Sequence, residues 1–209
     1  ISQIEYYAGL PRKYFVEEAL AELAESIAEH GVIQPLTVRK LSSGYYQIIA
    51  GERRWRAARM AGLKEVPVVV IEADDRTAME LAMVENLQRE DLNPMEEAEG
   101  YKALMDQYGM TQEQAAGRVG KSRSAVANAL RLLNLAPAVR KLVEENKLSA
   151  GHARALLPLS QRDQEKTAQT IVSTGLSVRQ TEMLVKRLQS AQEAEEAPPA
   201  PAAPTTVDY

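Results

Sequence analysis

The pattern of apolar residues changes along the chain, and this change constrains the fold more than any other feature. Three short runs rich in β-branched residues, at positions 34–40, 45–50 and 66–71, have the composition of strands. Before them, apolar residues recur at helical spacing over residues 19–27. No strand candidate occurs over residues 109–190, where helical spacing continues. The sequence therefore predicts an α+β chain, in which a mixed α/β domain is followed by an all-α domain.

Capping residues predict where the helices of the second part begin and end. Asn93 and Pro94 form an N-cap and a first-turn proline, which predicts a helix that continues to Gly109. A Thr or Ser followed three positions later by Gln predicts capping boxes over residues 111–114 and 177–180. We expect four glycines to separate a series of short helices: Gly109, Gly120, Gly151 and Gly175.

These signals divide the chain into three parts. Residues 1–92 are predicted to form the α/β domain, and residues 93–190 the helical domain. Residues 191–209 are rich in Pro and Ala and have too few large apolar side chains to offset their ordering entropy, so we expect a disordered linker or tail. The chain begins with Ile and stops after this tail. We therefore expect it to be trimmed, with a C-terminal module missing.

The composition excludes several classes of site. The chain has no Cys and only two His, His30 and His152. Disulfides, thiolate metal sites and cysteine nucleophiles are therefore excluded, and a zinc site has almost no ligands. No run of 18 apolar residues is present, and the N-terminus lacks the layout of a signal peptide. We expect a cytoplasmic protein with no membrane contact.

Charge is unevenly distributed along the chain. The formal net charge of all 209 residues is −4. Residues 109–160, however, carry eight Lys and Arg against three Asp and Glu, a balance of +5, whereas residues 1–108 have a balance of −7 and residues 161–209 a balance of −2. A basic segment inside an acidic chain favours contact with nucleic acid.

Residues 111–133, within the basic segment, have the pattern of a helix-turn-helix. Ala116, Gly120 and Val126 occupy the positions where the motif needs a small residue, a turn glycine and a core aliphatic residue. Any solvated helix carries such polar residues, but the spacing and the local charge together favour DNA binding. The start of the second helix is predicted to contact phosphates and base edges through Lys121, Ser122, Arg123, Ser124 and Asn128.

Residues 149–159 predict a second basic helix close behind. Gly151, His152 and Arg154 are candidates for DNA contact, but His152 has an equally good alternative as a helix cap or packing residue. The GKS sequence at residues 120–122 resembles the end of a phosphate-binding P-loop. That interpretation is excluded because Ala115 stands where the P-loop requires Gly, and a helix precedes the motif instead of a strand.

The stretch GERRWRAAR, residues 51–59, follows the second predicted strand and opens a helix. The backbone amides at Gly51 and the positive end of the helix dipole can receive an anion. Arg53, Arg54 and Arg56 add guanidinium groups whose geometry matches phosphate oxygens. The sequence therefore predicts a polyphosphate site. The alternative is a surface helix whose arginines pair with the acidic residues of the first part.

The stretch ENLQRED, residues 85–91, favours the phosphate interpretation. Glu85 and Asn86 carry oxygen ligands of the kind that Mg²⁺ accepts beside substrate phosphates. Glu52 and Glu85 are candidates to orient or deprotonate a water. Carboxylates beside a phosphate site indicate that a metal ion lies between them.

These motifs together resemble the ParB chromosome-partition family. The resemblance rests on LPRKYF, GVIQPLTVR, IIAGERRWRAARMAGL, VPVVV, ENLQREDLNPMEEA, GKSRSAVANALRLLNL and GHARALL, which occur in the family's order over about residues 10–190. It implies a ParB/sulfiredoxin-like domain that binds CTP with Mg²⁺, followed by a helical domain that binds the palindromic parS site. The family's C-terminal dimerisation domain is expected to be missing.

The resemblance also implies a role for individual residues. Gly51, Arg53 and Arg54 would contact the triphosphate, and Arg12 and Gly31 would line the nucleotide pocket. Asn86, with Glu85, would hold Mg²⁺. Glu52 and Glu85 would support the slow, DNA-stimulated hydrolysis of CTP to CDP and phosphate.

In the family, CTP joins the N-terminal domains of two protomers into a clamp that leaves parS and slides along DNA, and hydrolysis reopens it. The resemblance further implies a ParA-type ATPase and an SMC-type condensin as partners and a location on the nucleoid. One stretch departs from the family pattern, because Tyr7, Ala8 and Leu10 stand at the positions of its usual Asn, Pro and Gln.

The same motifs raise three alternative functions. Within the family, the rival is the nucleoid-occlusion branch, Noc, but Arg123 and Gly151 resemble the partition branch. Outside it, the rival is a helix-turn-helix transcriptional regulator whose first domain is structural and whose arginine turn is salt-bridged. A sulfiredoxin-type reductase is excluded because the chain has no cysteine.

Overall fold

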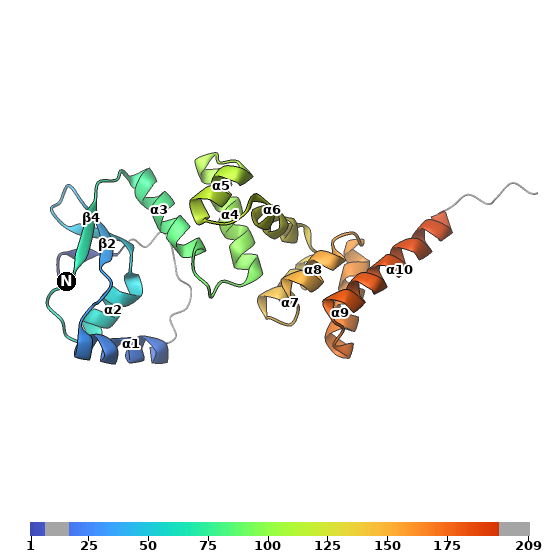
Figure 1. Ribbon diagram of the computed structural model, residues 1–209, viewed down its shortest axis with the longest axis horizontal. Helices are drawn as coiled ribbons and strands as arrows, with labels where there is room; N and C mark the ends of the chain where they lie inside the picture. The colour runs from blue at the N-terminus through green and yellow to red at the C-terminus, as the bar shows by residue number, and fades with distance from the viewer. Residues whose placement is uncertain (7–16, 197–209) are drawn as a thin grey trace, which may run out of the picture. The chain divides into compact units, whose positions relative to one another are not determined.

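The computed structural model describes residues 1–6 and 17–196, and these residues form two compact units (Figure 1). The pocket unit consists of residues 1–92 and 100–123, and the helical unit consists of residues 93–99 and the chain from Ser124 on. Each unit is described by itself. The α+β fold class predicted from the sequence is confirmed.

A four-stranded sheet forms the centre of the pocket unit, with the strand order β1-β3-β2-β4. β2 (Leu36–Lys40) and β3 (Tyr46–Ala50) pair antiparallel, β4 (Val68–Ile71) lies parallel to β2, and β1 (Ile4–Glu5) lies parallel to β3. The three strands predicted from the sequence are present. β1 was missed because two residues carry no period, and its pairing with β3 is a long-range contact.

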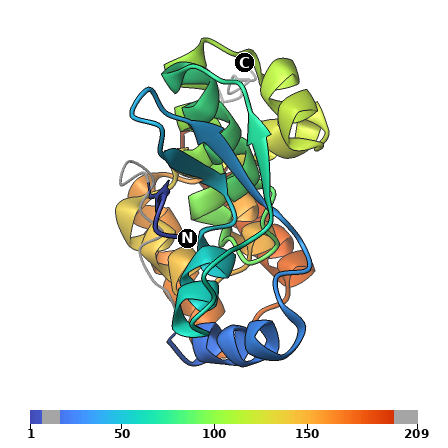
Figure 2. The ribbon, with the colours of Figure 1, turned by 90° about the vertical axis from the view of Figure 1, so that its left-hand side faces the viewer.

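One face of the sheet packs against helices. Leu36, Val38 and Ile48 alternate toward the same face and form a core with Trp55 of α2 (Glu52–Met60). α1 (Glu17–His30) packs on α2 through small side chains, Ala57 and Ala58 among them. Figure 2 shows α1 and α2, in blue and cyan, near the lower end of the strands. This packing fixes the position of α2 at the end of β3.

The alternate residues of β2 and β3 point to the other face of the sheet, away from this core. Arg39 and Gln47 are register partners on β2 and β3, and they lie on the face that α3 (Asp75–Leu87) covers. Asp74 caps α3 by accepting a hydrogen bond from the Thr77 backbone N–H at 2.7 Å. Hydrogen bonds from Thr77 lower the pKa of the Asp74 carboxyl. The cap keeps α3 helical from its first turn.

Helix α4 (Pro94–Tyr108) is shared by the two units, since its first turns belong to the helical unit and its residues from Gly100 on belong to the pocket unit. The Asn93 side chain accepts hydrogen bonds from the backbone N–H groups of Met95 and Glu96, both at 2.9 Å. Gly109 follows the helix with a positive φ of 65°. Both predicted ends of α4 are confirmed.

The predicted helix-turn-helix is formed by α5 (Gln112–Val119) and α6 (Arg123–Arg131). Thr111 and Gln114 make the predicted capping box, and Gly120 ends α5 in the left-handed conformation, with φ 73°. Ala116 and Val126 are buried, as the motif requires. The division into units passes through the motif, because α5 belongs to the pocket unit and the chain from Ser124 on belongs to the helical unit.

The helical unit continues with a 3₁₀ turn η1 (Leu132–Asn134), α7 (Pro137–Glu144), α8 (Ala150–Leu156), α9 (Gln161–Thr174) and α10 (Val178–Glu196). Aliphatic side chains such as Val139, Leu156 and Ile171 form its core. Gln164 is buried among them, but its amide accepts a hydrogen bond from Ala136 N and donates one to Leu159 O. Both ends of this buried amide are therefore satisfied.

Two details of the sequence prediction need correction. Gly151 does not separate helices: Ser149 caps α8, and Gly151 lies in its first turn, where an added Cβ would be 3.0 Å from Val178 Cγ2. This glycine allows close packing instead of a turn. In addition, α10 continues to Glu196, so the predicted tail is helical over residues 191–196, and residues 197–209 lie outside the described residues.

The predicted domain boundary between residues 92 and 93 coincides with the first crossing of the chain between the units. The chain then returns to the pocket unit for residues 100–123. The predicted absence of strands after residue 109 holds for the described residues. Within that same part of the chain, no helix combines the length and apolar character that a membrane span requires.

The close approach of α3 and α4 generates a prediction about stability. A Cβ on Gly100 would overlap Leu87 Cδ2 and lie 3.0 Å from Leu87 Cγ, and Leu87 is buried. We expect Gly100→Ala to lower the free energy of unfolding by about 1–3 kcal/mol, because the core must shift to admit the methyl group. Urea denaturation would measure this change.

Gly117 of α5 provides a matched control, since it is also helical but has no atom within 4 Å of an added Cβ. Gly117→Ala is expected to be neutral or to stabilise the chain by up to about 1 kcal/mol, through helix propensity alone. Equal stability of the two variants would contradict the packing argument.

Candidate functional site

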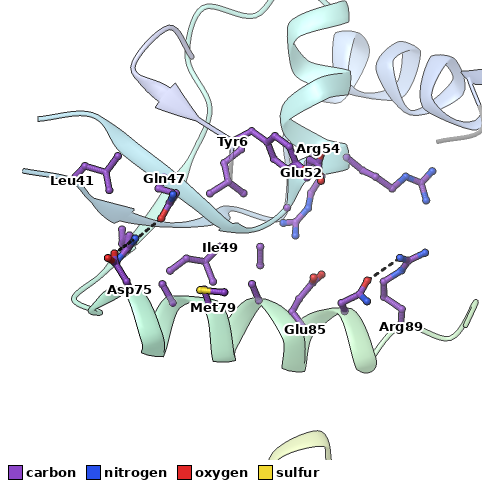
Figure 3. A pocket seen from close by; sticks show the side chains of 18 of the residues that line it. Tyr6, Leu41, Gln47, Ile49, Glu52, Arg54, Asp75, Met79, Glu85 and Arg89 are labelled. Atoms are coloured by element: carbon purple, nitrogen blue, oxygen red, sulfur yellow. Dashed lines mark hydrogen bonds and ion pairs between the residues drawn. The ribbon is translucent and has the colours of Figure 1, made fainter. Parts of the chain in front are cut away.

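A cavity of about 980 Å³ lies in the pocket unit, between the sheet and α3 (Figure 3). Its walls come from β2, β3, the first turn of α2, the inner side of α3 and the residues that follow α3. Six of the residues singled out from the sequence line this one cavity, namely Gly51, Glu52, Arg53, Arg54, Glu85 and Asn86. The structure thus brings together two stretches that are more than thirty residues apart in the sequence.

Gly51 connects β3 to α2 and is the N-cap of the helix, with φ 103° and ψ 24°. No side chain caps the helix, so the amides of its first turn are available to an anion, favoured by the helix dipole. A Cβ at this position would lie 3.0 Å from Leu36 Cγ and 3.3 Å from the Arg54 guanidinium. Both the backbone conformation and the space therefore require glycine.

Arg54 is held by backbone carbonyls. Its Nη1 donates to Gln34 O at 2.7 Å and to Pro35 O at 2.6 Å, so the side chain folds back past Gly51. These contacts fasten the connection between α1 and β2 to the start of α2. Arg54 therefore has a structural role that the sequence did not indicate, and its remaining donors face the cavity it lines.

The other arginines of α2 divide into free and paired groups. Arg56 forms an ion pair with Glu52 at 2.7 Å and lies over the Tyr6 ring at 5.7 Å, and Arg59 lies over the Trp55 ring at 5.0 Å. Arg53 has no ion pair, hydrogen bond or ring contact with the described residues. The salt-bridged alternative is therefore correct for Arg56, whereas Arg53 is left available to a ligand.

The Glu52 side chain is 17% exposed and is held by Arg56. Tyr6 lies nearby and lines the same cavity. Burial raises the pKa of the Tyr6 phenol, and the negative charge of Glu52 raises it further, while Arg56 partly opposes the change. Tyr6 is therefore a neutral hydrogen-bonding group at physiological pH.

Glu85 and Asn86 lie in the last turn of α3, and Figure 3 shows Glu85 pointing into the space below Glu52 and Arg54. The Asn86 side-chain oxygen accepts a hydrogen bond from Arg89 Nη1 at 3.1 Å. Arg89 also forms an ion pair with Asp91 and lines the cavity. Sequence reasoning gave Arg89 no role, although it lies in the same stretch as Asn86.

The oxygen atoms of Glu85 and Asn86 fit Mg²⁺ only together with a ligand that supplies phosphate oxygens. No group of three or more His, Cys, Asp or Glu placed to hold a metal occurs in residues 1–6 and 17–196. Glu85 offers a carboxylate and Asn86 an amide oxygen, and Mg²⁺ is usually bound through one or two such groups plus phosphates and waters. For Asn86 to bind the metal, its side-chain oxygen would also have to give up the hydrogen bond from Arg89.

A second polar group at the cavity was missed by sequence reasoning. Arg39 is 7% exposed, and its guanidinium donates to Gln47 Oε1 at 2.8 Å, to Asp75 Oδ1 at 2.6 Å and to Ala73 O at 3.3 Å. These contacts join β2 and β3 to the start of α3. No sequence signal marks them, since an Arg in a strand normally points to solvent.

Two predicted nucleotide contacts are not among these residues. Arg12 lies outside the described residues. Gly31 ends α1 with φ 73°, donates its N–H to Ile27 O at 2.8 Å, and is not among the residues that line the cavity. The observed role of Gly31 is to end the helix, and its contact with a nucleotide stays a prediction.

The predicted DNA contacts of the helix-turn-helix are accessible. Lys121, Ser122, Arg123 and Ser124 are exposed at the turn and at the start of α6, and Asn128 is half-buried one turn later. The exposed positions lie at the N-terminal end of the helix, where side chains and backbone amides both favour phosphate. These side chains are therefore accessible, and their contact with DNA stays a prediction.

His152 is used within the protein. It completes a capping box with Ser149, whose Oγ lies 2.7 Å from His152 Nδ1, and its Nε2 donates to Leu176 O at 2.8 Å. The capping alternative is therefore confirmed, and contact with DNA would have to replace one of these bonds. Arg154, in the same helix, is exposed.

Together, these features define a class of protein in which an α/β unit with a polar cavity and a helix-turn-helix occur in one chain. Residues 1–87 match the family model of the ParB N-terminal domain, and residues 90–190 match that of the ParB HTH domain. The chain belongs to the ParB family.

Two relatives illustrate the similarity. The chromosome-partitioning protein Spo0J of Thermus thermophilus is 58% identical over 181 residues, which cover 87% of this chain and 66% of that protein. The chromosome-partitioning protein ParB of Myxococcus xanthus is 56% identical over 182 residues, covering 87% and 61%. The chain therefore spans less than two thirds of the length of these relatives.

A solved structure is also similar. It is the C-terminally truncated chromosome-partitioning protein ParB from Caulobacter crescentus, complexed to the centromeric parS site. Its sequence is 45% identical, the match covers 89% of this chain and 96% of that chain, and the TM-score is 0.78.

The geometry at Gly51 generates a second prediction about stability. Gly51→Ala should lower the melting temperature more than Gly44→Ala, although both positions have positive φ, 103° and 85°. Both variants pay about 1–2 kcal/mol for the left-handed conformation. Only at Gly51 does the new Cβ meet a buried side chain, Leu36. We expect this contact to cost a further 1 kcal/mol or more, about 2–4 °C for a chain of this size.

Thermal unfolding followed by circular dichroism would measure both variants. Gly44 is the control because no atom lies within 4 Å of an added Cβ there. If the two melting temperatures fell equally, the space at Gly51 would not be limiting.

Proposed function

We propose that this chain is the part of a chromosome-partition protein that binds CTP with Mg²⁺ and the parS site, and that CTP binding and hydrolysis close and reopen a sliding DNA clamp. One observation carries the proposal. The turn at Gly51 faces Glu85 and Asn86 across a single cavity, in a chain that also contains an accessible helix-turn-helix. CTP as the particular nucleotide rests on the family resemblance of the motifs.

In this proposal, the phosphates bind at the first turn of α2. The backbone amides after Gly51 donate to phosphate oxygens. Arg53, whose guanidinium has no partner among the described residues, approaches the same oxygens. Arg54 keeps the α1–β2 connection in place and offers its remaining donors to the same phosphates. In this proposal, the backbone amides and Arg53 therefore make the main contacts with the negative charge of the phosphates.

Hydrolysis would use the carboxylates on the two sides of the cavity. Mg²⁺, held by Asn86 with Glu85, would neutralise charge on the phosphates when bound. Glu52 or Glu85 would accept the proton of a water whose oxygen forms the new bond to the γ-phosphorus, as the bond to the β-phosphate oxygen breaks. The ion pair with Arg56, at 2.7 Å, restricts the Glu52 carboxylate at the edge of the cavity. The products are CDP and phosphate.

The DNA-binding half follows from the accessible start of α6. The similar Caulobacter crescentus protein is complexed to parS in its crystal structure. By analogy, Arg123 would contact guanine and Asn128 adenine, while Lys121, Ser122 and Ser124 would contact phosphates. Gly151 and Arg154 of α8 lie on a second helix proposed to reach the DNA, with His152 contributing only if it leaves its cap.

The remaining functions belong to the whole protein. CTP would join the pocket units of two protomers into the clamp, and a ParA-type ATPase and an SMC-type condensin are the proposed partners on the nucleoid, in the cytoplasm. A helix-turn-helix regulator with a structural first domain is the second candidate. It is favoured by the observation that Arg54 and Arg56 are already occupied by protein groups.

A nucleotide titration separates these functions. Isothermal titration calorimetry with CTP and Mg²⁺ should show binding, and the other three ribonucleoside triphosphates should bind more weakly. Arg53→Ala should weaken CTP binding by about 10- to 150-fold, as expected when a charge-assisted hydrogen bond worth about 1.5–3 kcal/mol is lost.

Arg59 provides the matched control, because it is on the same helix but stacks on Trp55 and is not among the residues lining the cavity. Arg59→Ala should leave CTP affinity within about twofold. Absence of CTP binding, or equal losses in the two variants, would favour the structural first domain.

The DNA half has its own test. Arg123→Ala should weaken binding to a parS duplex by about 1–3 kcal/mol, the value of one bidentate base contact, and should weaken binding to a scrambled duplex much less. Fluorescence anisotropy with both duplexes measures the ratio. Arg131, exposed at the other end of α6, is the control, and Arg131→Ala should leave the ratio unchanged. Equal losses of Arg123→Ala on both duplexes would assign Arg123 to phosphate contact.

A further inference from the structure

Helix α3 has two sides with different partners. One side lines the cavity through Ala78, Met79, Ala82, Glu85 and Asn86. Other positions contact the helices that follow it. Leu87 packs against Gly100 of α4, Arg76 lies over the Tyr108 ring at 5.7 Å, and Glu80 pairs with Arg118 of α5. The wall of the nucleotide pocket is therefore held from behind by α4 and α5.

The Glu80–Arg118 contact is the ion pair among these. Arg118 Nη2 lies 3.3 Å from Glu80 Oε1, and the side chains are 59% and 16% exposed. Glu80 is mostly shielded from water, so solvent stabilises its negative charge less than it would stabilise an exposed carboxylate. The contact with Arg118 therefore matters more to Glu80 than it would to an exposed side chain. An ion pair is also more directional than the apolar contacts beside it. It therefore distinguishes one placement of α3 from another.

Arg118 lies in α5, which is part of the helix-turn-helix and also part of the pocket unit. α5 is the first helix of the helix-turn-helix, and it ends at Gly120, directly before the predicted DNA contacts Lys121 to Ser124. By its contacts, however, α5 belongs to the pocket unit and not to the helical unit. A ligand that fixes the start of α6 therefore also acts on the helix that holds the pocket wall.

We propose that Arg118 is a positioning residue of the nucleotide pocket: through Glu80 it sets the placement of α3, and so links occupation of the pocket to occupation of the helix-turn-helix. This inference rests on the proposed function and deepens it. If both ligands act on the placement of α3, each changes the affinity of the other by the same factor. Removing the ion pair should reduce this factor.

The experiment measures dissociation constants of a non-hydrolysable CTP analogue by calorimetry in the presence of Mg²⁺, with and without a saturating parS duplex, on residues 1–209. The analogue is used because hydrolysis would disturb the binding equilibrium. The ratio of the two constants should differ from one in the unmodified chain. In Arg118→Ala and in Glu80→Ala, the ratio should move toward one by about two- to fivefold, the range expected for a partly exposed ion pair. The charge-swapped double variant, Glu80→Arg with Arg118→Glu, should restore it.

Lys102 supplies the matched control. It pairs with Asp106 at 2.6 Å in the same unit, but this pair lies within α4 and does not reach α3. Lys102→Ala should leave the ratio unchanged. A merely structural role for Arg118 would alter stability without altering a ratio taken within one variant.

The experiment distinguishes a failure of this inference from a failure of the proposed function. If the unmodified chain bound no CTP, the proposed function would be overturned and this inference with it. CTP binding at equal strength with and without the duplex would overturn the inference alone. The same applies if the ratio differed from one but stayed unchanged in Arg118→Ala and Glu80→Ala.

Discussion

The site depends on one backbone feature, a left-handed glycine between a strand and a helix. At φ 103°, Gly51 turns the chain so that α2 begins with uncapped amides facing a cavity. The missing side chain also leaves room for Leu36 in the core and for Arg54, which crosses the turn to reach two carbonyls. The core on one face of the sheet and the proposed anion site at its end are therefore both fitted around this glycine, and replacing it would disturb both.

Helix α3 places the second half of the site. Its start is fastened to the sheet through Arg39 and Asp75, and its end carries Glu85 and Asn86 to the space opposite Arg54. The same helix contacts α4 and α5 on its other side. The pocket wall and α5, the first helix of the helix-turn-helix, are thus packed together within the pocket unit. In the proposed function, this packing is the route by which a bound nucleotide would act as a switch more than as a substrate.

Short-range chemistry made much of this predictable. Strands β2 to β4, the caps at Asn93 and Thr111, and the turn at Gly120 each follow from a few neighbouring residues. That residues 51–59 and 85–91 lie at one site was predicted from the family resemblance and from the phosphate chemistry that the two stretches share. Long-range contacts were not predictable. The carbonyls that hold Arg54 lie 19 and 20 residues away, and the packing of Gly151 on Val178 looked like a turn signal in the sequence. The return of residues 100–123 to the pocket unit likewise depends on tertiary packing.

The central claim is that the uncapped amides after Gly51 bind the phosphates of CTP. A ¹H–¹⁵N NMR titration of the chain with CTP and Mg²⁺ tests it most directly, because each amide reports on its own contacts. The account predicts that the largest shifts occur at the backbone amides of Gly51 to Arg54, together with the side-chain amide of Asn86. Saturable binding with these resonances unmoved, and with the shifts confined to other parts of the chain, would contradict it.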